Sequence, residues 1–160
     1  MIEVWRIVRK RHAATAFSGE GTRRYGGRWN HPGTAVIYTA ASQSLAILEV
    51  LVGLDPEDAP AEFALLRAVV PDGVPIKTME AATLPPGWNV YPGPEALRDL
   101  GDAWARSGGT CVLSIPSAIV PRERNYLLSP SHPDMASIRI DPAESFTFDP
   151  RLWKTGAPLH

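Results

Sequence analysis

The chain has 160 residues, of which 44% are hydrophobic, and a formal net charge of −1. This length suits one globular domain that buries about 70% of its unfolded surface, so we expect a single domain over residues 1–160 with its core at about 4–153. The charge gives no reason to expect nucleic-acid binding, because non-specific binders carry a clear cationic excess. The single cysteine, Cys111, excludes an internal disulfide framework and a cysteine-based zinc site.

The chain also lacks the apolar segments that direct a protein to a membrane. Its N-terminal residues contain no apolar signal region, and no run of about 18 apolar residues occurs anywhere. We therefore expect a soluble, cytoplasmic protein without membrane contact.

The N-terminal part alternates between strand-like and glycine-rich segments. Residues 4–8 alternate as in a short strand, residues 18–33 form a long polar loop, and the apolar residues 35–39 are typical of a buried strand. Long ordered loops usually serve a site. The segment from Arg6 to Arg28 is rich in Arg and Lys, which fits a phosphate-bearing ligand as well as a solvated face.

The next element is predicted to be a helix from Ser42 to about Val52. Ser42 is a suitable N-cap, and Gly53 a suitable C-terminal stop. Because the segment is apolar nearly all round, we expect the helix inside the fold, and Glu49 with it.

The second half of the chain contains both strand and helix signals. A polar, turn-rich stretch is expected at 121–134, an irregular loop at 84–94, and an amphipathic helix from Pro94 to Gly108. The apolar face of this helix is expected to contain Leu97, Leu100, Ala103 and Trp104. The β-prone segments, predicted as strands, are residues 63–70, 111–115, 137–140 and 146–148.

These elements predict an α+β fold in one compact domain with a mixed or mainly antiparallel sheet. Strands and helices do not alternate strictly, which argues against a parallel βαβ sheet. The chain has neither GxGxxG after a strand nor GxxxxGK[ST], which argues against Rossmann and P-loop enzymes.

Glu49 is the most informative candidate residue, because it stands alone among the apolar residues 45–52. An unpaired buried carboxylate costs several kcal/mol, so it needs a partner or a chemical role. Arg28 follows two glycines and could grip a phosphate or carboxylate with two hydrogen bonds. A salt bridge within the turn explains Arg28 equally simply, and a structural pair with an Arg explains Glu49.

Other candidates carry weaker signals. Tyr38 fits a core aromatic whose hydroxyl finds a buried acceptor. Ser117 follows Pro116 at the end of a strand, but there is no G-x-S-x-G elbow, which disfavours a serine hydrolase. The four histidines lack metal-ligand spacing, and a structured turn explains His132, so we expect no metal site.

Taken in order, several short motifs resemble one family. They are GGRWN at 26–30, YTA at 38–40, LAILEV at 45–50, LPPGW at 84–88, IPS at 115–117 and NYLLSPSHP at 125–133, with Trp5 and Arg6 near the start. This set resembles RES-domain proteins, the toxins of bacterial RES–Xre toxin–antitoxin pairs. The family is named for an Arg, a Glu and a Ser, which here would be Arg28, Glu49 and Ser117. It commonly has Asn where this chain has Ser129.

The resemblance implies an ADP-ribosyltransferase-like fold and a toxin that consumes NAD as its substrate. Glu49 would stabilise the oxocarbenium-like ribose, as carboxylates do in glycoside cleavage. Arg28, with Arg6 as a second candidate, would hold the pyrophosphate. Tyr38 would stack on nicotinamide, and Ser117 and Asn125 would bind ribose or carboxamide. The expected partner is a helix-turn-helix, Xre-like antitoxin, and family members often form homodimers.

Three functions remain open at this point. The first is an NAD glycohydrolase or phosphorylase. The second is an ADP-ribosyltransferase with the same site and a specific protein acceptor. The third is a binding module in which Glu49 and Arg28 form a purely structural pair.

Overall fold

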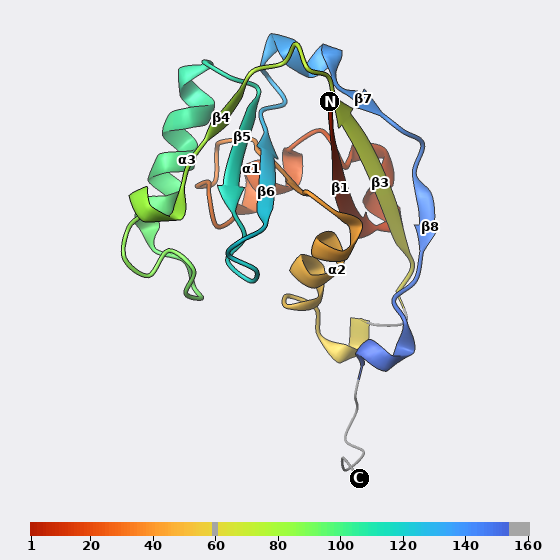
Figure 1. The fold of residues 1–160 in the computed structure, drawn as a ribbon. Helices are drawn as coiled ribbons and strands as arrows, with labels where there is room; N and C mark the ends of the chain where they lie inside the picture. Colours follow the sequence, from red (N-terminus) through yellow and green to blue (C-terminus); the bar gives the residue numbers. More distant parts are fainter. Residues whose placement is uncertain (59–60, 154–160) are drawn as a thin grey trace.

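A computed structural model describes residues 1–58 and 61–153, which contain one mainly antiparallel sheet (Figure 1). Within these residues the sheet has eight strands in the order β4-β5-β6-β2-β1-β3-β7, with β8 also pairing with β3, and only β4 and β5 run parallel. The strands are β1 (Ile2–Arg9), β2 (Ile37–Ala40), β3 (Phe63–Val70), β4 (Ile76–Thr78), β5 (Val112–Pro116), β6 (Arg124–Leu128), β7 (Arg139–Ile140) and β8 (Glu144–Phe146).

Three α-helices accompany this sheet in the described residues. They are α1 (Glu20–Tyr25), α2 (Gln43–Leu51) and α3 (Glu95–Ser107), and the 3-10 helix η1 (Lys10–Thr15) follows β1. The predicted α+β class with a mixed, mainly antiparallel sheet is confirmed. The assignment of residues 1–160 to one domain stays a prediction, and its last residues, 154–160, lie outside the described ranges.

The sheet is weakly joined at its centre. β1 pairs with β3 along its whole length, from Ile2↔Val70 to Arg9↔Phe63, but with β2 only at Trp5↔Ala40. β2 in turn pairs with β6 over all four of its residues. The strands therefore form two groups that diverge between β1 and β2, and Figure 1 shows α2 below this divergence.

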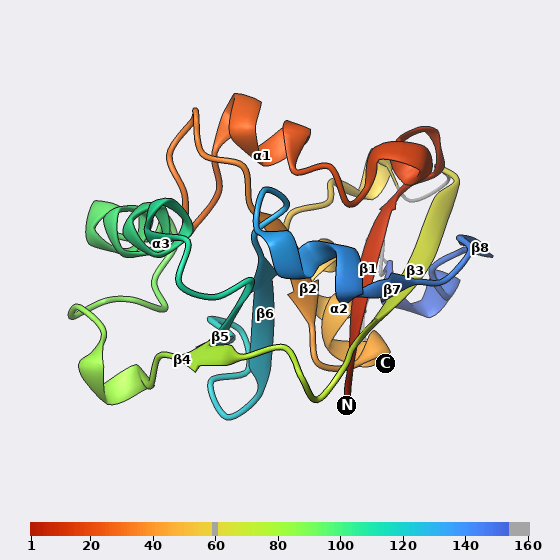
Figure 2. The ribbon, with the colours of Figure 1, turned by 90° about the horizontal axis from the view of Figure 1, so that it is seen from above.

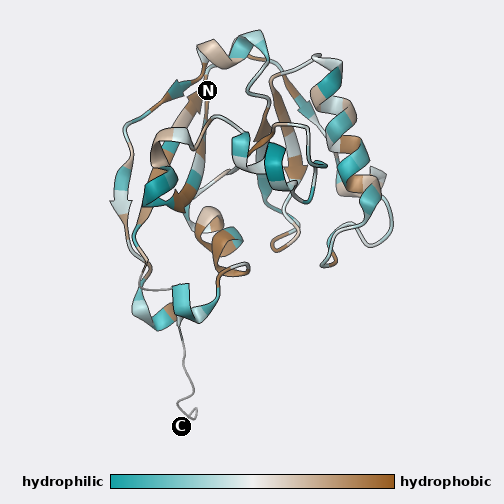
Figure 3. Cartoon of the chain, turned by 180° about the vertical axis from the view of Figure 1, so that it is seen from behind, coloured by the Kyte–Doolittle hydropathy of each residue, from teal (hydrophilic) through white to brown (hydrophobic). Residues whose placement is uncertain are grey.

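Helix α2 begins where the sequence predicts, but it is not an interior helix. The Ser42 side chain caps it by accepting a hydrogen bond from the Leu45 N–H at 3.1 Å. Leu45 and Ala46 are buried, whereas Leu48 is 40% exposed and Val52, just after the helix, is 69% exposed. The predicted burial of the whole helix is wrong, because only one side packs on the sheet. Figure 3 shows its apolar colouring.

Helix α3 is confirmed from Glu95 to Ser107, with Pro94 and Gly108 as its caps. Leu97 and Trp104 are buried as predicted, but Ala103 is exposed. Gly101 lies on the buried face instead, and a Cβ there would stand 1.7 Å from the carbonyl oxygen of Trp29. The helix backbone thus packs directly on the segment that carries Arg28.

One α-helix and two strands were not predicted. α1 lies within the expected loop 18–33, β4 lies in an exposed edge position, and β6 occupies the stretch 121–134 that we expected to be turns. The polar start of β6 misled the prediction, since Arg124 and Asn125 look like loop residues. In the fold the Arg124 guanidinium is bound by Ser114 Oγ at 2.9 Å and by the Met79 carbonyl at 2.7 Å.

Candidate active site

Glu49 lies at a cavity of about 250 Å³ where β1 and β2 diverge under α2. Its lining contains three of the predicted ligand-binding residues together with aromatic and apolar side chains. The lining residues are Trp5, Arg6, Ile7, Tyr38, Thr39, Ala40, Ala46, Glu49, Val50 and Asn125. The cavity thus brings Arg6, Tyr38 and Asn125 together with Glu49.

The Glu49 carboxylate is held by two neutral donors. Its Oε1 accepts hydrogen bonds from Ser117 Oγ at 2.8 Å and from Asn125 Nδ2 at 2.6 Å. Among residues 1–58 and 61–153, no cationic side chain lies within 4.0 Å of this carboxylate. Glu49 is partly buried, not interior as predicted, and the structural pair with Arg28 is not formed.

Ser117 is a buried partner of Glu49 and does not itself line the cavity. Its side chain is 0% exposed, and its Oγ accepts hydrogen bonds from the N–H groups of Ile119 and Val120, both at 3.1 Å. With both acceptor sites occupied, the hydroxyl proton points to Glu49. This geometry orients the carboxylate and leaves no free lone pair on Ser117 for a ligand.

Two buried polar atoms at the cavity have no hydrogen-bond partner within the described residues, namely Arg6 Nε and Asn125 Oδ1. Such atoms are rare in native structures and call for an explanation. One is a donor and the other an acceptor, and both belong to residues that line the cavity. A ligand with anionic and hydrogen-bond donor groups would satisfy both.

Arg6 is an unpaired cation at this site. Its Nη1 donates to the Tyr38 carbonyl at 2.8 Å, and no carboxylate of the described residues lies within ion-pair distance. Desolvation by burial lowers the pKa of Arg6 to about 10, so the side chain still carries its charge at neutral pH. A buried cation without a counterion is stabilised when an anion binds.

Tyr38 connects the cavity to the turn that carries Arg28. Its hydroxyl donates to Asn30 Oδ1 at 2.6 Å and accepts from the Trp29 N–H at 2.9 Å, while its side chain borders the cavity. Burial raises the pKa of Tyr38 well above its usual range, so it is neutral at physiological pH. The hydroxyl therefore has a structural use, as the sequence suggested for a core aromatic.

Arg28 is the predicted site residue that the structure does not bring to Glu49. Its Nη1 donates to the carbonyls of Trp88 and Val90 at 3.1 Å and 2.8 Å, which ties it to the loop 84–94. Arg28 is absent from the lining of the Glu49 cavity. The predicted intramolecular salt bridge is also not formed, because both acceptors are backbone oxygens.

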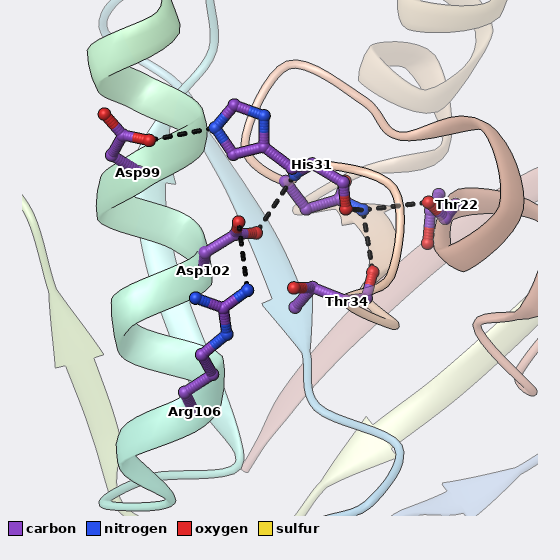
Figure 4. A network of polar contacts seen from close by, with 7 residues as sticks. Thr22, His31, Thr34, Asp99, Asp102 and Arg106 are labelled. Atoms are coloured by element: carbon purple, nitrogen blue, oxygen red, sulfur yellow. Dashed lines mark hydrogen bonds and ion pairs between the residues drawn. The ribbon is translucent and has the colours of Figure 1, made fainter.

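A polar network fixes the segment around Arg28 to α3 (Figure 4). The buried carboxylate of Asp102 accepts a hydrogen bond from the His31 N–H at 3.0 Å, and His31 Nε2 lies 2.9 Å from Asp99. Asn30 Nδ2 donates to the carbonyls of Thr22 and Thr34. The network holds the glycine-rich turn rigidly beside the helix.

Some lining residues were missed by the sequence reasoning. Trp5 and Ile7 project from β1 onto the side of the sheet that α2 covers, and Val50 follows Glu49 on α2. The alternation of residues along β1 could have predicted two of them, because Trp5 and Ile7 lie on the same face of the strand.

The remaining candidates have structural explanations. His132 caps the 3-10 helix Pro133–Ser137 by accepting a hydrogen bond from the Asp134 N–H at 3.0 Å.

The described residues contain no group of three or more His, Cys, Asp or Glu side chains that could hold a metal ion. None of the helices found there is both long and apolar enough to span a bilayer.

Comparison with known proteins defines the class to which this fold and site belong. The family model described as RES domain matches residues 3–149. Toxin Res of Pseudomonas putida is 42% identical over 152 residues, covering 94% of this chain and 99% of the relative. Toxin Res of Yersinia enterocolitica is 39% identical over 151 residues, covering 93% of this chain and 98% of the relative.

Two further similarities are informative. The Prs ADP-ribosylating toxin of Sphingobium sp. is 39% identical over 153 residues, covering 92% of this chain and 94% of the relative. The crystal structure of the M. tuberculosis MbcT–MbcA toxin–antitoxin complex contains a chain with the same fold, with a TM-score of 0.74 at 20% identity, covering 95% of this chain and 86% of that one.

The chain belongs to the RES-domain family, as its motifs predicted. It is a toxin of that family, and its sheet has the architecture of the MbcT fold.

Proposed function

We propose that this toxin cleaves the bond between nicotinamide and ribose in NAD. The observation that carries the proposal is the Glu49 carboxylate, whose Oε1 is fixed by Ser117 and Asn125 at a cavity that is also lined by the unpaired Arg6. The ADP-ribosylating activity in the name of the Sphingobium relative supports NAD as the substrate.

The reaction requires stabilisation of a positive charge on the ribose. The glycosidic C–N bond breaks and its electron pair leaves with the pyridinium nitrogen, so nicotinamide departs as a neutral molecule without an acid. The ribose then has oxocarbenium character, which a fixed carboxylate in a partly desolvated site stabilises far better than water does. An acceptor oxygen finally bonds to the same ribose carbon and gives up its proton.

The cavity residues suggest a role for each neighbour of Glu49. Ser117 and Asn125 orient the carboxylate, and Asn125 Oδ1 is free to accept a hydrogen bond from ribose or the carboxamide. The Tyr38 ring offers a surface for nicotinamide, and Arg6 offers a cation for the pyrophosphate. Arg28 does not line the cavity and is tied by Nη1 to the loop carbonyls of Trp88 and Val90, so it would have to move to contact the pyrophosphate.

The candidate reactions differ in the molecule that accepts the ADP-ribosyl group. Water as the acceptor would give a glycohydrolase, and phosphate would give a phosphorylase. Both acceptors, and a protein acceptor as well, share one transition state at the ribose. A protein acceptor is the second candidate, because one relative is named for ADP-ribosylation. A non-catalytic binding module is the third, although its premise, a Glu49–Arg28 pair, is not formed.

We further propose that a helix-turn-helix, Xre-like antitoxin neutralises this chain in the cytoplasm. The complex of MbcT with MbcA supports an antitoxin partner in general. We also propose that this chain forms a homodimer.

The acceptor is identified by incubating the purified protein with NAD, in buffer with and without phosphate, and separating the products by chromatography. We expect nicotinamide together with ADP-ribose in water, or with phosphorylated ADP-ribose when phosphate is the acceptor. If nicotinamide is released only with cell lysate, and labelled NAD marks one protein, the transferase is correct. If nicotinamide is released under no condition, the proposal is wrong.

A further inference from the structure

A second, larger groove lies beside the Glu49 cavity and shares Arg6 with it. This groove has a volume of about 760 Å³ and is bounded by β1, η1 and α1. Figure 2 shows η1, the red turns after β1, and α1 along one side of the molecule. Arg6 lines both hollows.

The charged side chains that line the groove are mainly cationic. Besides Arg6 it contains Arg9, Arg11, His12 and Arg24, and its carboxylate is Glu20. Arg9 is paired with Asp58 at 2.9 Å. Arg11 and Arg24 are exposed, and among residues 1–58 and 61–153 neither has a carboxylate within 4.0 Å.

The one carboxylate of the lining is already engaged. Glu20 accepts hydrogen bonds from Arg23 Nε at 2.9 Å and 3.0 Å, and this partner lowers the pKa of Glu20 below its ordinary value. In Rossmann-fold enzymes a carboxylate commonly binds the ribose 2′-hydroxyl of NAD, whereas an arginine accommodates the 2′-phosphate of NADP. The groove lacks a free carboxylate for this use, and instead offers arginines that suit phosphate.

We propose that this groove binds the adenosine half of the dinucleotide, with Arg6 at the pyrophosphate and Arg11 and Arg24 near the ribose, and that the protein therefore accepts a 2′-phosphorylated dinucleotide as well as NAD. This inference rests on the proposed cleavage of NAD. The reacting bond lies at Glu49 in the first cavity, and the groove contributes affinity and selectivity.

The kinetic test compares three substrates and two variants of the full chain. NAD, NADP and nicotinamide mononucleotide are cleaved by the unmodified protein, by the double variant Arg11→Ala/Arg24→Ala, and by Lys77→Ala. Lys77 is the matched control, because it is an exposed cation on the distant edge strand β4. Nicotinamide mononucleotide lacks the adenosine half, so it reports on the first cavity alone.

We expect NADP and NAD to have kcat/KM values within about tenfold of each other in the unmodified protein. In the double variant, KM should rise about tenfold for NAD and more for NADP, with kcat unchanged, since charge-assisted contacts to phosphate are lost. Nicotinamide mononucleotide and Lys77→Ala should show no change. Unchanged KM values in the double variant, or an NADP efficiency more than about a hundredfold below that of NAD, would overturn the proposal and leave NAD cleavage standing.

A binding measurement separates the groove from the chemistry. Adenosine 2′,5′-bisphosphate is titrated calorimetrically into the unmodified protein and into the double variant, with inorganic phosphate as a comparison. Binding that is lost in the double variant supports the groove even if neither dinucleotide is cleaved, in which case only the proposed function fails. No binding, or equally strong binding of inorganic phosphate, contradicts the assignment of the groove to adenosine.

Discussion

At the scale of single residues, the site depends on how one carboxylate is held. Glu49 has two neutral donors in place of a cation, which leaves its charge available to a developing positive charge. The sequence indicated that Glu49 needed an explanation, but not which one. The partners Ser117 and Asn125 follow from the pairing of β5 with β6, which brings the ends of both strands to α2.

Replacing Ser117 by Ala tests its role as a positioning residue. The change removes the donor to Glu49 and the acceptor of two backbone N–H groups, so we expect a loss of about 1–3 kcal/mol in the free energy of unfolding. We also expect kcat to fall while KM stays nearly constant. Denaturant unfolding and steady-state kinetics measure both, with Ser145→Ala on β8 as an exposed control. A raised KM with unchanged kcat would mean that Ser117 acts on the ligand instead.

Tyr38 predicts a distinct response to alkaline pH. Its pKa is raised in the folded state, so above about pH 10 the unfolded chain ionises first and binds fewer protons than the native state. This contribution to stability is complete below pH 10 and is lost as the pH rises beyond it.

The free energy of unfolding of Tyr38→Phe at pH 7 should therefore be about 1–3 kcal/mol lower than that of the unmodified protein. Between pH 9 and 11, however, the variant should lose less stability than the unmodified protein. Urea titrations at several pH values measure this, and Tyr91→Phe, an 89% exposed position, is the control. Parallel pH profiles for Tyr38→Phe and the unmodified protein would contradict the account.

At the scale of elements, the local signals were reliable where the backbone itself needs a particular residue. Ser42 marked the start of α2, and Gly108, in the left-handed conformation, marked the end of α3. β6 was missed because its polar residues are satisfied by distant partners, Ser114 and Glu49, that no local pattern contains. The exposure of α2 was missed because an apolar pattern does not say how many sides of a helix are covered by the rest of the fold.

The contact between α3 and the glycine-rich turn gives a prediction at this scale. Gly101→Ala would place a methyl group 1.7 Å from the Trp29 carbonyl, so α3 or the turn has to move. We expect a loss of about 3 kcal/mol or more in unfolding free energy, at the upper end of the cost of overpacking. Gly109→Ala, whose nearest neighbour would be Ser107 Oγ at 3.7 Å, is the control. Equal stability of the two variants in denaturant titrations would contradict the close packing.

At the scale of the whole molecule, the division of the sheet explains why the site lies where it does. β1 and β2 pair only at Trp5↔Ala40, and the Glu49 cavity and the larger groove both use the residues of β1 beyond that point. The order of motifs predicted the family, and four of the ten lining residues of the cavity, Arg6, Tyr38, Glu49 and Asn125, were predicted site residues. It placed Arg28 at the same site, whereas the turn's packing on α3 and the loop 84–94 directs that side chain elsewhere.

The release of nicotinamide from NAD by Glu49→Gln tests the central claim most directly. The Gln side-chain oxygen can still accept from Ser117 and Asn125, so we expect a folded protein with an unchanged melting temperature. Release should nevertheless fall at least about a hundredfold, because the charge is gone, while Glu144→Gln, an exposed glutamate on β8, should match the unmodified protein. Full activity in a stable Glu49→Gln protein would contradict a catalytic carboxylate at this position.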